Sequence, residues 1–321
     1  MTVDAVPTLR ADTRTLHGWF DHDLPPVLTV DPGTTVRFET LDSGWFLEPD
    51  TGGDVADRRR APGYTPDAGH ALTGPVQVRG ARAGQVLAVR VDSVVPASWG
   101  TAYAGLAGTA WNARLGITGP AVHGWAIDVA AGTARNQHGH TVAVRPFLGI
   151  IGMPPAEPGR HSTIPPRWHG GNLDCRELVA GSTLYLPIPV DGALLSVGDA
   201  HAAQGDGEVC VTGIECPMYA ALRFDLHKSR NLPASQFATP GPLTPKVEGA
   251  GWYATMGVNE DLMQAAKDSL RAMVEHVSTT YHIEPVEAYV LASLVVDLKI
   301  SEIVDRPNWI VSSYLPLAIF G

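Results

Sequence analysis

Short runs rich in Val, Leu, Ile and Thr recur along this chain, and each is bounded by Gly, Pro, Asp or Asn. Between them, 34 glycines and 26 prolines supply the turns, a pattern typical of antiparallel β-structure. We therefore predict a mainly antiparallel β fold of the sandwich or barrel kind, in which Asp31-Pro32-Gly33 closes a β-hairpin. The predicted strands lie at 27–30, 34–40, 76–78, 85–95, 141–144, 183–190 and 208–215.

A proline-rich stretch at 228–249 separates this β pattern from a different one. We place a domain boundary there. Residues 1–227 are predicted to form a mainly β domain that carries the active site, and residues 228–321 a smaller portion packed on it.

The smaller portion has helical periodicity. Asn259 can cap a helix whose apolar positions recur at threes and fours: Leu262, Ala266, Leu270 and Met273. Pro285 suits the first turn of a second helix, and residues 296–301 alternate as a strand does. The predicted fold class is α+β, predominantly antiparallel β with a C-terminal helix-helix-strand portion.

Composition excludes several kinds of partner. The formal charge of -10 leaves no basic stripe for nucleic-acid phosphates or anionic lipids, so we expect a small-molecule partner, no nucleic acid and no membrane. Residues 1–15 hold no apolar run that resembles a signal peptide or an anchor, and we therefore expect a cytoplasmic protein. The three cysteines form no disulfide framework.

The densest cluster of carboxyl and imidazole groups lies between 160 and 215. If residues 196–201 end a strand, Asp199 and His201 emerge on one face and can share a metal ion. Asp206 and Glu208 repeat that spacing, and the flanking glycines allow a turn that folds this pair back on the first. Asp174 can join from a neighbouring loop. The predicted metal ligands are therefore Asp174, Asp199 and His201.

This donor set suits hydrolysis of an amide, which needs a polarised carbonyl, an activated nucleophile and a proton for the departing nitrogen. A metal ion and one carboxylate meet these needs. Glu208 is the first choice for the general base and acid, with Asp206 as the second catalytic carboxylate. Zinc is the cation expected from the imidazole, whereas the oxygen-rich remainder also suits calcium.

Other interpretations of these residues stay open. Asp and His beside glycines often cap turns without binding a ligand. His17 can be a ligand or a core histidine, and Cys175 and Cys216 can be nucleophiles or buried inert thiols.

Several strings in the chain resemble the acetamidase/formamidase family over nearly its whole length. The most specific are Gly170-Gly171-Asn172-Leu173-Asp174, Ala180-Gly181-Ser182-Thr183-Leu184 and Gly198-Asp199-Ala200-His201-Ala202-Ala203-Gln204-Gly205-Asp206-Gly207-Glu208. The resemblance implies a cytoplasmic, homo-oligomeric and mostly β hydrolase of small linear amides that carries divalent metal. Asn172, Gln204 and His17 are expected to contact the substrate.

Two rival functions follow from the same residues. One is a metal-dependent hydrolase of another carbon-nitrogen substrate, such as a cyclic amide, a carbamate or a urea-like compound. The other is a non-catalytic small-ligand binder in which the acidic cluster is a structural calcium site.

Overall fold

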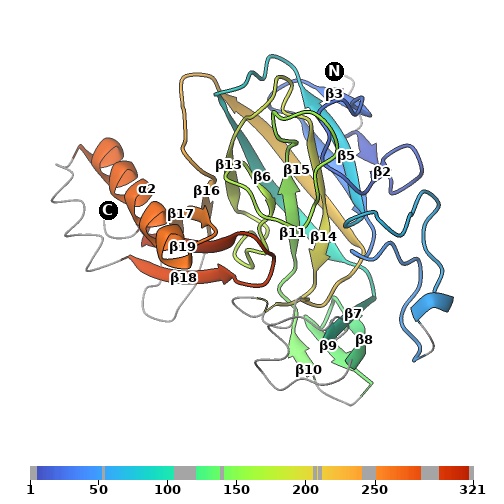
Figure 1. Cartoon of the computed structure of the whole chain (residues 1–321). Helices are drawn as coiled ribbons and strands as arrows, with labels where there is room; N and C mark the ends of the chain where they lie inside the picture. Colours follow the sequence, from blue (N-terminus) through green and yellow to red (C-terminus); the bar gives the residue numbers. More distant parts are fainter. Residues whose placement is uncertain are drawn as a thin grey trace.

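A computed structural model describes residues 6–52, 55–104, 121–137, 141–204, 208, 212–240, 251–282 and 296–317. Strands dominate this part of the chain and form open sheets, with one long helix near the C-terminal end (Figure 1). The fold class predicted from the sequence is confirmed in its sandwich-like form rather than as a closed barrel.

The largest sheet has nine strands and continues from the β body into the C-terminal portion. Its strands pair antiparallel except for the first two, which are parallel. In spatial order they are β1 (Thr8–Leu9), β4 (Thr35–Thr40), β15 (Met218–His227), β6 (Val86–Pro96), β13 (Thr183–Pro187), β16 (Gln236–Thr239), β17 (Trp252–Asn259), β19 (Trp309–Pro316) and β18 (Asp297–Glu302).

Two smaller sheets complete the β-structure. The six-stranded sheet contains β12 (Gly171–Asn172), β11 (Phe147–Gly152), β14 (Leu195–His201), β5 (Leu72–Val78) and β2 (Leu16–His17), with β3 (Leu28–Val30) parallel to β5. The four-stranded sheet contains β10 (Thr141–Ala143), β9 (Thr133–Asn136), β8 (Ala121–Asp128) and β7 (Trp99–Ala104). In Figure 1 this small sheet lies at the lower end of the body.

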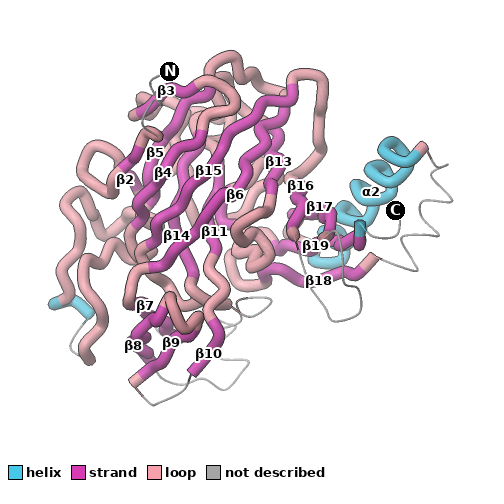
Figure 2. The backbone as a smooth tube through the Cα atoms, turned by 180° about the vertical axis from the view of Figure 1, so that it is seen from behind, coloured by secondary structure: helices cyan, strands magenta, loops and turns pink. Residues whose placement is uncertain are grey.

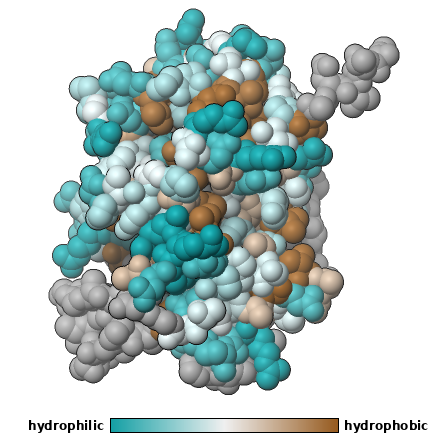
Figure 3. Space-filling model, turned by 90° about the vertical axis from the view of Figure 1, so that its right-hand side faces the viewer, coloured by the Kyte–Doolittle hydropathy of each residue, from teal (hydrophilic) through white to brown (hydrophobic). Residues whose placement is uncertain are grey.

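The main core lies between the nine-stranded and six-stranded sheets. Alternation along β6 turns Leu87, Val89 and Val91 inward, while Arg90 on the same strand is exposed. These inward side chains belong to one buried cluster with Val76 and Leu148 of the facing sheet. The face seen in Figure 3 is mostly hydrophilic, with hydrophobic residues in separate small areas. Among the described residues, the largest buried apolar cluster is the one between these two sheets.

The helix α2 (Leu262–Tyr281) packs beside β17 and β19, apart from the sandwich (Figure 2). Its buried side chains include Met273 and Val277, and they meet Tyr253 of β17. The chain also has a short 3-10 helix, η1 (Val55–Asp57). Within the described residues, no helix is both long and apolar enough to span a membrane.

The predicted hairpin at Asp31-Pro32-Gly33 is wrong. The strands on either side form, but β3 pairs with β5 and β4 pairs with β15, in different sheets. The turn carries the chain from one sheet of the sandwich to the other, because each strand has an apolar face to bury against the common core.

The helix cap and the strand predicted at 296–301 both lie within the described residues. The helix is capped by Asp261, whose carboxylate accepts from the backbone N–H of Gln264 at 2.7 Å, and not by Asn259. The predicted strand at 296–301 is confirmed as β18. The second helix, predicted from Pro285, lies outside the described residues, as does most of the run 208–215. The boundary after residue 227 stays a prediction, although β16 beyond it pairs with β13 before it.

Candidate active site and metal centre

The candidate site forms where β11, β12 and β14 meet. In the β11–β14 ladder Leu148 pairs with Ala200, which places Gly149 beside Asp199. A Cβ on Gly149 would stand 2.5 Å from Asp174 Oδ1 and 2.5 Å from the carbonyl oxygen of Asp199. Only glycine leaves this space, so its missing side chain lets two carboxylates converge.

Three carboxylate residues of the site have left-handed backbones. The φ angles are 42° at Asp174, 51° at Asp199 and 45° at Glu208. Non-glycine residues avoid this region at a cost of about 1–3 kcal/mol each, and such strain gathers at functional sites. At Asp199 it also breaks the regular alternation of β14. Asp199 and His201 therefore converge through a bend in the strand rather than through the simple two-residue spacing expected from the sequence.

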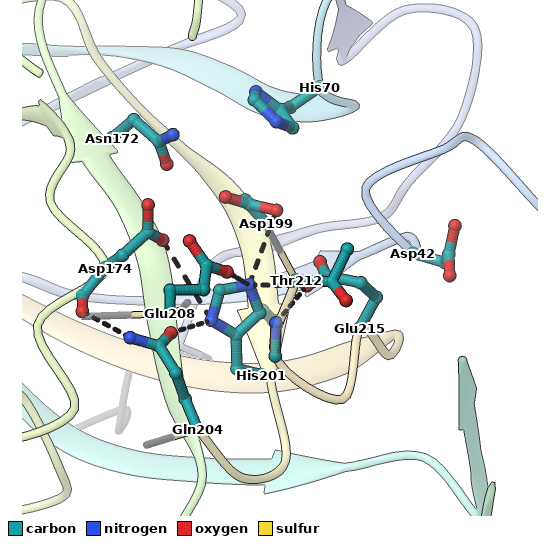
Figure 4. A network of polar contacts seen from close by, with 12 residues as sticks. Asp42, His70, Asn172, Asp174, Asp199, His201, Gln204, Glu208, Thr212 and Glu215 are labelled. Atoms are coloured by element: carbon teal, nitrogen blue, oxygen red, sulfur yellow. Dashed lines mark hydrogen bonds and ion pairs between the residues drawn. The ribbon is translucent and has the colours of Figure 1, made fainter. Parts of the chain in front are cut away.

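The imidazole of His201 is the centre of the site (Figure 4). Its Nε2 lies 2.9 Å from Glu215 Oε1, 3.6 Å from Asp199 Oδ1 and 3.6 Å from Glu208 Oε1. Its Nδ1 lies 4.0 Å from Asp174 Oδ1. We call these residues the His201 cluster: Asp174, Asp199, His201, Glu208 and Glu215. All are buried, and their ligand atoms fall into two groups, each within 4.8 Å, that share His201.

Several polar atoms of the His201 cluster have no hydrogen-bond partner although they are buried. They are both carboxylate oxygens of Asp174, Oε2 of Glu215 and Nε2 of His201. Glu215 Oε1 lies close to that nitrogen, but without the alignment of a hydrogen bond. Four buried carboxylates around one imidazole require a compensating charge. Their unpaired atoms fit a divalent cation.

The pKa values reflect this crowding. Burial raises the pKa of Asp174, and the charge of Asp199 raises it further. Burial and then Asp174 raise the pKa of Glu208 in the same way. The pKa of Glu215 rises to about 7 through burial, although His201 opposes the rise. Groups shifted against each other in this way mark functional sites more often than structural ones.

The pKa values of the two remaining residues, His201 and Asp199, shift in the direction opposite to the one that burial alone would cause. Burial alone would lower the pKa of His201, but Glu215 and Asp199 raise it well above its usual value. Burial alone would raise the pKa of Asp199, but His70 and His201 hold it below its ordinary range. Each group is therefore stabilised in its charged form by its neighbours.

Comparison with known proteins decides the family. The acetamidase/formamidase family model matches residues 2–159 and 156–321. The chain belongs to the acetamidase/formamidase family.

Relatives in this family match over most of their length. A formamidase from Methylophilus methylotrophus is 27% identical, with 95% of this chain and 89% of that protein covered. An acetamidase from Mycolicibacterium smegmatis is 25% identical over 81% of this chain and 78% of its own. The crystal structure of an acetamidase from Bacillus halodurans superimposes with a TM-score of 0.83 at 26% identity, covering 98% of both chains.

The sequence segments from which the site of this family member was predicted lie close together in the structure. Asp174, Asp199, His201 and Glu208 come together as described. Asn172 lies above Asp174 in Figure 4. Gln204 bridges two cluster members, since its Oε1 meets His201 Nδ1 at 2.7 Å and its Nε2 donates to the Asp174 carbonyl at 2.8 Å.

Four other candidate residues, His17, Asp206, Cys175 and Cys216, have different outcomes. Both ring nitrogens of His17 are engaged, by the Trp19 carbonyl at 2.8 Å and Ser196 Oγ at 2.9 Å, and burial lowers its pKa to about 4. Asp206 lies outside the described residues. Burial raises the pKa of the Cys175 thiol, and likewise that of Cys216; neither is poised as a thiolate nucleophile.

Sequence reasoning missed Glu215, His70 and Asp42 as site residues. Glu215 reaches the cluster because its backbone bridges to His201 and to Thr101, a long-range pairing with no local sequence signal. His70 is held by Thr163 Oγ1, which contacts its Nδ1 at 2.9 Å, and it faces Asp199 in Figure 4. Asp42 is buried nearby, and burial raises its pKa to about 6 despite Arg58.

Proposed function

We propose that this chain hydrolyses small linear amides of the formamide and acetamide class to the carboxylate and ammonia, with a divalent cation held by the His201 cluster. The observation that carries the proposal is the set of buried, unpaired carboxylate and imidazole atoms around His201. Relatives named formamidase and acetamidase cover most of the chain, and they support an enzyme of the amidase class.

The residues that would hold the cation are Asp174, Asp199 and His201, with Glu215 as a further donor. We propose zinc, because the one imidazole favours it, and we treat calcium as the alternative that the oxygen-rich remainder suits. A bound divalent cation supplies Lewis-acid chemistry, since it polarises the amide carbonyl and lowers the pKa of a water.

Glu208 is proposed as the group that moves protons. Its carboxylate is buried, and its pKa is raised well above the usual value by burial and by Asp174. A carboxyl group whose pKa is raised in this way is a stronger base when ionised, so it can take a proton from the attacking water and pass it to the departing nitrogen. Asp206 is kept as a second catalytic carboxylate on the grounds of its place in the sequence.

The neighbouring amide side chains have supporting roles in this proposal. Gln204 fixes the ring of His201 through Nδ1, which leaves Nε2 facing the carboxylates. Asn172 is proposed to contact the substrate. His17 was also expected from the sequence to contact the substrate. Both of its ring nitrogens are engaged by Ser196 and Trp19, so we propose that it supports β14, the strand that carries Ser196.

The first test is ammonia release from a panel of small amides by the purified protein, before and after chelation, with zinc and calcium returned separately. We expect turnover of formamide or acetamide, loss on chelation and recovery with zinc. Recovery with calcium but not with zinc would identify calcium as the resident cation. Turnover that persists without metal would show that side chains alone carry out the chemistry. Turnover of only a cyclic amide or a carbamate would show that the substrate belongs to that class instead.

We also propose that the protein works as a cytoplasmic homo-oligomer, as its family resemblance implies. Light scattering on the purified protein gives the oligomeric state, and a molar mass equal to that of one chain would contradict this part.

A further inference from the structure

The side chain of Asn172 has one polar atom satisfied by the protein and one left over. Its Nδ2 donates to the Ile164 carbonyl at 3.1 Å and to Asp305 Oδ2 at 2.6 Å. Its Oδ1 has no hydrogen-bond partner, although the residue is only 2% exposed. A buried acceptor without a donor is costly and calls for a ligand that brings one.

The orientation of this amide is fixed by its surroundings. The Ile164 carbonyl can only accept a hydrogen bond, so the nitrogen of Asn172 must point to it. Exchanging the two ends would set Oδ1 against that carbonyl oxygen and leave Asp305 facing a second acceptor. Oδ1 is therefore held away from both partners, and Figure 4 shows it turned toward the side of Asp174.

The group that locks Asn172 comes from the far end of the chain. Asp305 lies in the turn between β18 and β19 and is itself 8% exposed. Its backbone N–H donates to Glu302 Oε1 at 2.6 Å, and Glu302 is fully buried. The N–H of Val304 donates to the same oxygen. The carboxylate of Glu302 thus holds the backbone of the turn, and the turn places the carboxylate of Asp305 against Asn172.

We infer that Asp305 is a positioning residue that aims Asn172 Oδ1 at an N–H of the substrate, and that this pair makes the site selective for carbonyl compounds bearing an N–H over the corresponding esters. The inference rests on the proposed function, because it assigns the contact that recognises the amide nitrogen. The free oxygen that Asn172 presents is an acceptor, so an N–H donor such as that of an amide is the group that complements it.

The experiment compares formamide with methyl formate, which has the same acyl group but no N–H. The ratio of the two kcat/KM values is measured for the wild type and for each variant, so that intrinsic ester reactivity cancels between proteins. We expect Asn172→Leu to lower the amide-to-ester ratio by at least about tenfold, as loss of a buried acceptor contact implies. Asp305→Ala should lower it by about three- to tenfold, and Asp305→Asn should restore most of it.

A matched control is Ser301→Ala, which removes the buried 2.7 Å hydrogen bond between Ser301 Oγ and Ser312 Oγ in the same β18–β19 hairpin. It should leave the ratio unchanged. If Asp305→Ala does not fold, Asp305→Ser replaces it with a smaller loss of volume. Equal losses of amide and ester turnover in the Asp305 variants would overturn the inference alone. No amide turnover by the metal-loaded wild type would overturn the proposed function, and the inference with it.

Discussion

Two buried sets of charged groups lie close together in the chain, and they are built in opposite ways. The Glu177 network consists of Glu177 with Cys175, Arg176, Lys299 and Tyr314. In it Oε1 of Glu177 faces Lys299 Nζ at 3.4 Å and Arg176 Nε at 3.5 Å, while Oε2 accepts from the Tyr314 hydroxyl at 3.0 Å. In the His201 cluster, by contrast, carboxylates face one another and several atoms lack partners.

Their backbones differ as well. The Glu177 network joins the loop before β13 to β18 and β19, and no residue in it has a positive φ. Three of the five residues in the His201 cluster have one. A carboxylate neutralised by cations and hydroxyls stabilises a junction, whereas a crowd of buried carboxylates with strained backbones and some unpartnered oxygens fits a ligand. The comparison predicts that one set governs activity and the other stability.

Glu208→Gln should have the largest effect of all, and it should fall on activity. Loss of a general base and acid lowers kcat/KM by roughly 10²–10⁴-fold. The free energy of unfolding should not fall, because the change removes a carboxyl group whose charge is opposed by burial and by Asp174. Ammonia release and urea unfolding measure the two quantities. Turnover close to that of the wild type would show that Glu208 is not the general base and acid.

Glu177→Gln should show the reverse pattern. Removing the anion leaves Lys299, whose side chain is 16% exposed, beside a neutral group. Breaking a buried pair of this kind costs about 3 kcal/mol of stability, while turnover per folded molecule should change little. If Glu177→Gln instead lost activity with normal unfolding, the division of roles between the two sets would be wrong.

Gly149→Ala should damage the His201 cluster through packing alone. The new methyl group would meet Asp174 Oδ1 and the Asp199 carbonyl at 2.5 Å, so both must shift. We expect about 1–3 kcal/mol of destabilisation and weaker zinc binding, measured by competition with a chromogenic chelator. Gly124→Ala is the control, since the nearest atom to its Cβ would be the Asp50 carbonyl oxygen at 3.0 Å, away from the His201 cluster. Equal zinc affinity in the two variants would contradict this account of Gly149.

The comparison also shows what the sequence alone could predict. Local patterns were sufficient for fewer than half of the strands, for α2 and for the meeting of Asp199, His201 and Glu208, because these depend on residues close together in the chain. They did not predict β11, β15, β17 or β19. Asp174 was expected from a neighbouring loop on chemical grounds, and the family resemblance agreed with that expectation. The helix cap was misplaced by two residues because Asn259 and Asp261 are both good caps, and Asn259 instead accepts from the Asp261 N–H.

What sequence reasoning missed depends on long-range pairing. Glu215 enters through bridges to His201 and Thr101, and Asp305 through a contact with Asn172. The pairing of β3 and β4 with different sheets was missed for the same reason, since a turn sequence does not reveal which sheet the next strand joins.

The smallest predicted effect is a pH dependence that separates the two regions. Burial raises the pKa of Glu215 from 4.5 to about 7, and the pKa of His201 is also raised, by Glu215 and Asp199 against the effect of burial. Between about pH 4.5 and pH 7 the carboxyl groups with raised pKa values, Glu215, Asp174 and Glu208, therefore bind more protons in the metal-free folded protein than in the unfolded chain, so the stability that the cluster contributes falls as the pH rises. The buried His17, whose pKa is lowered to about 4, opposes this fall between about pH 4 and pH 6.5. Asp199 has the opposite sign, but its pKa lies below 3.8, so its contribution is constant across this window.

Urea unfolding of the chelated protein should thus give a lower free energy at about pH 7 than at about pH 5, by on the order of 1–2 kcal/mol. Zinc should cancel or reverse the slope, because a cation binds the deprotonated ligands. Glu215→Gln should reduce the slope of the chelated protein, and Glu177→Gln should keep it while lowering stability at every pH. A slope that vanishes in Glu177→Gln and survives in Glu215→Gln would place the responsible protons in the Glu177 network and reverse the roles assigned to the two sets.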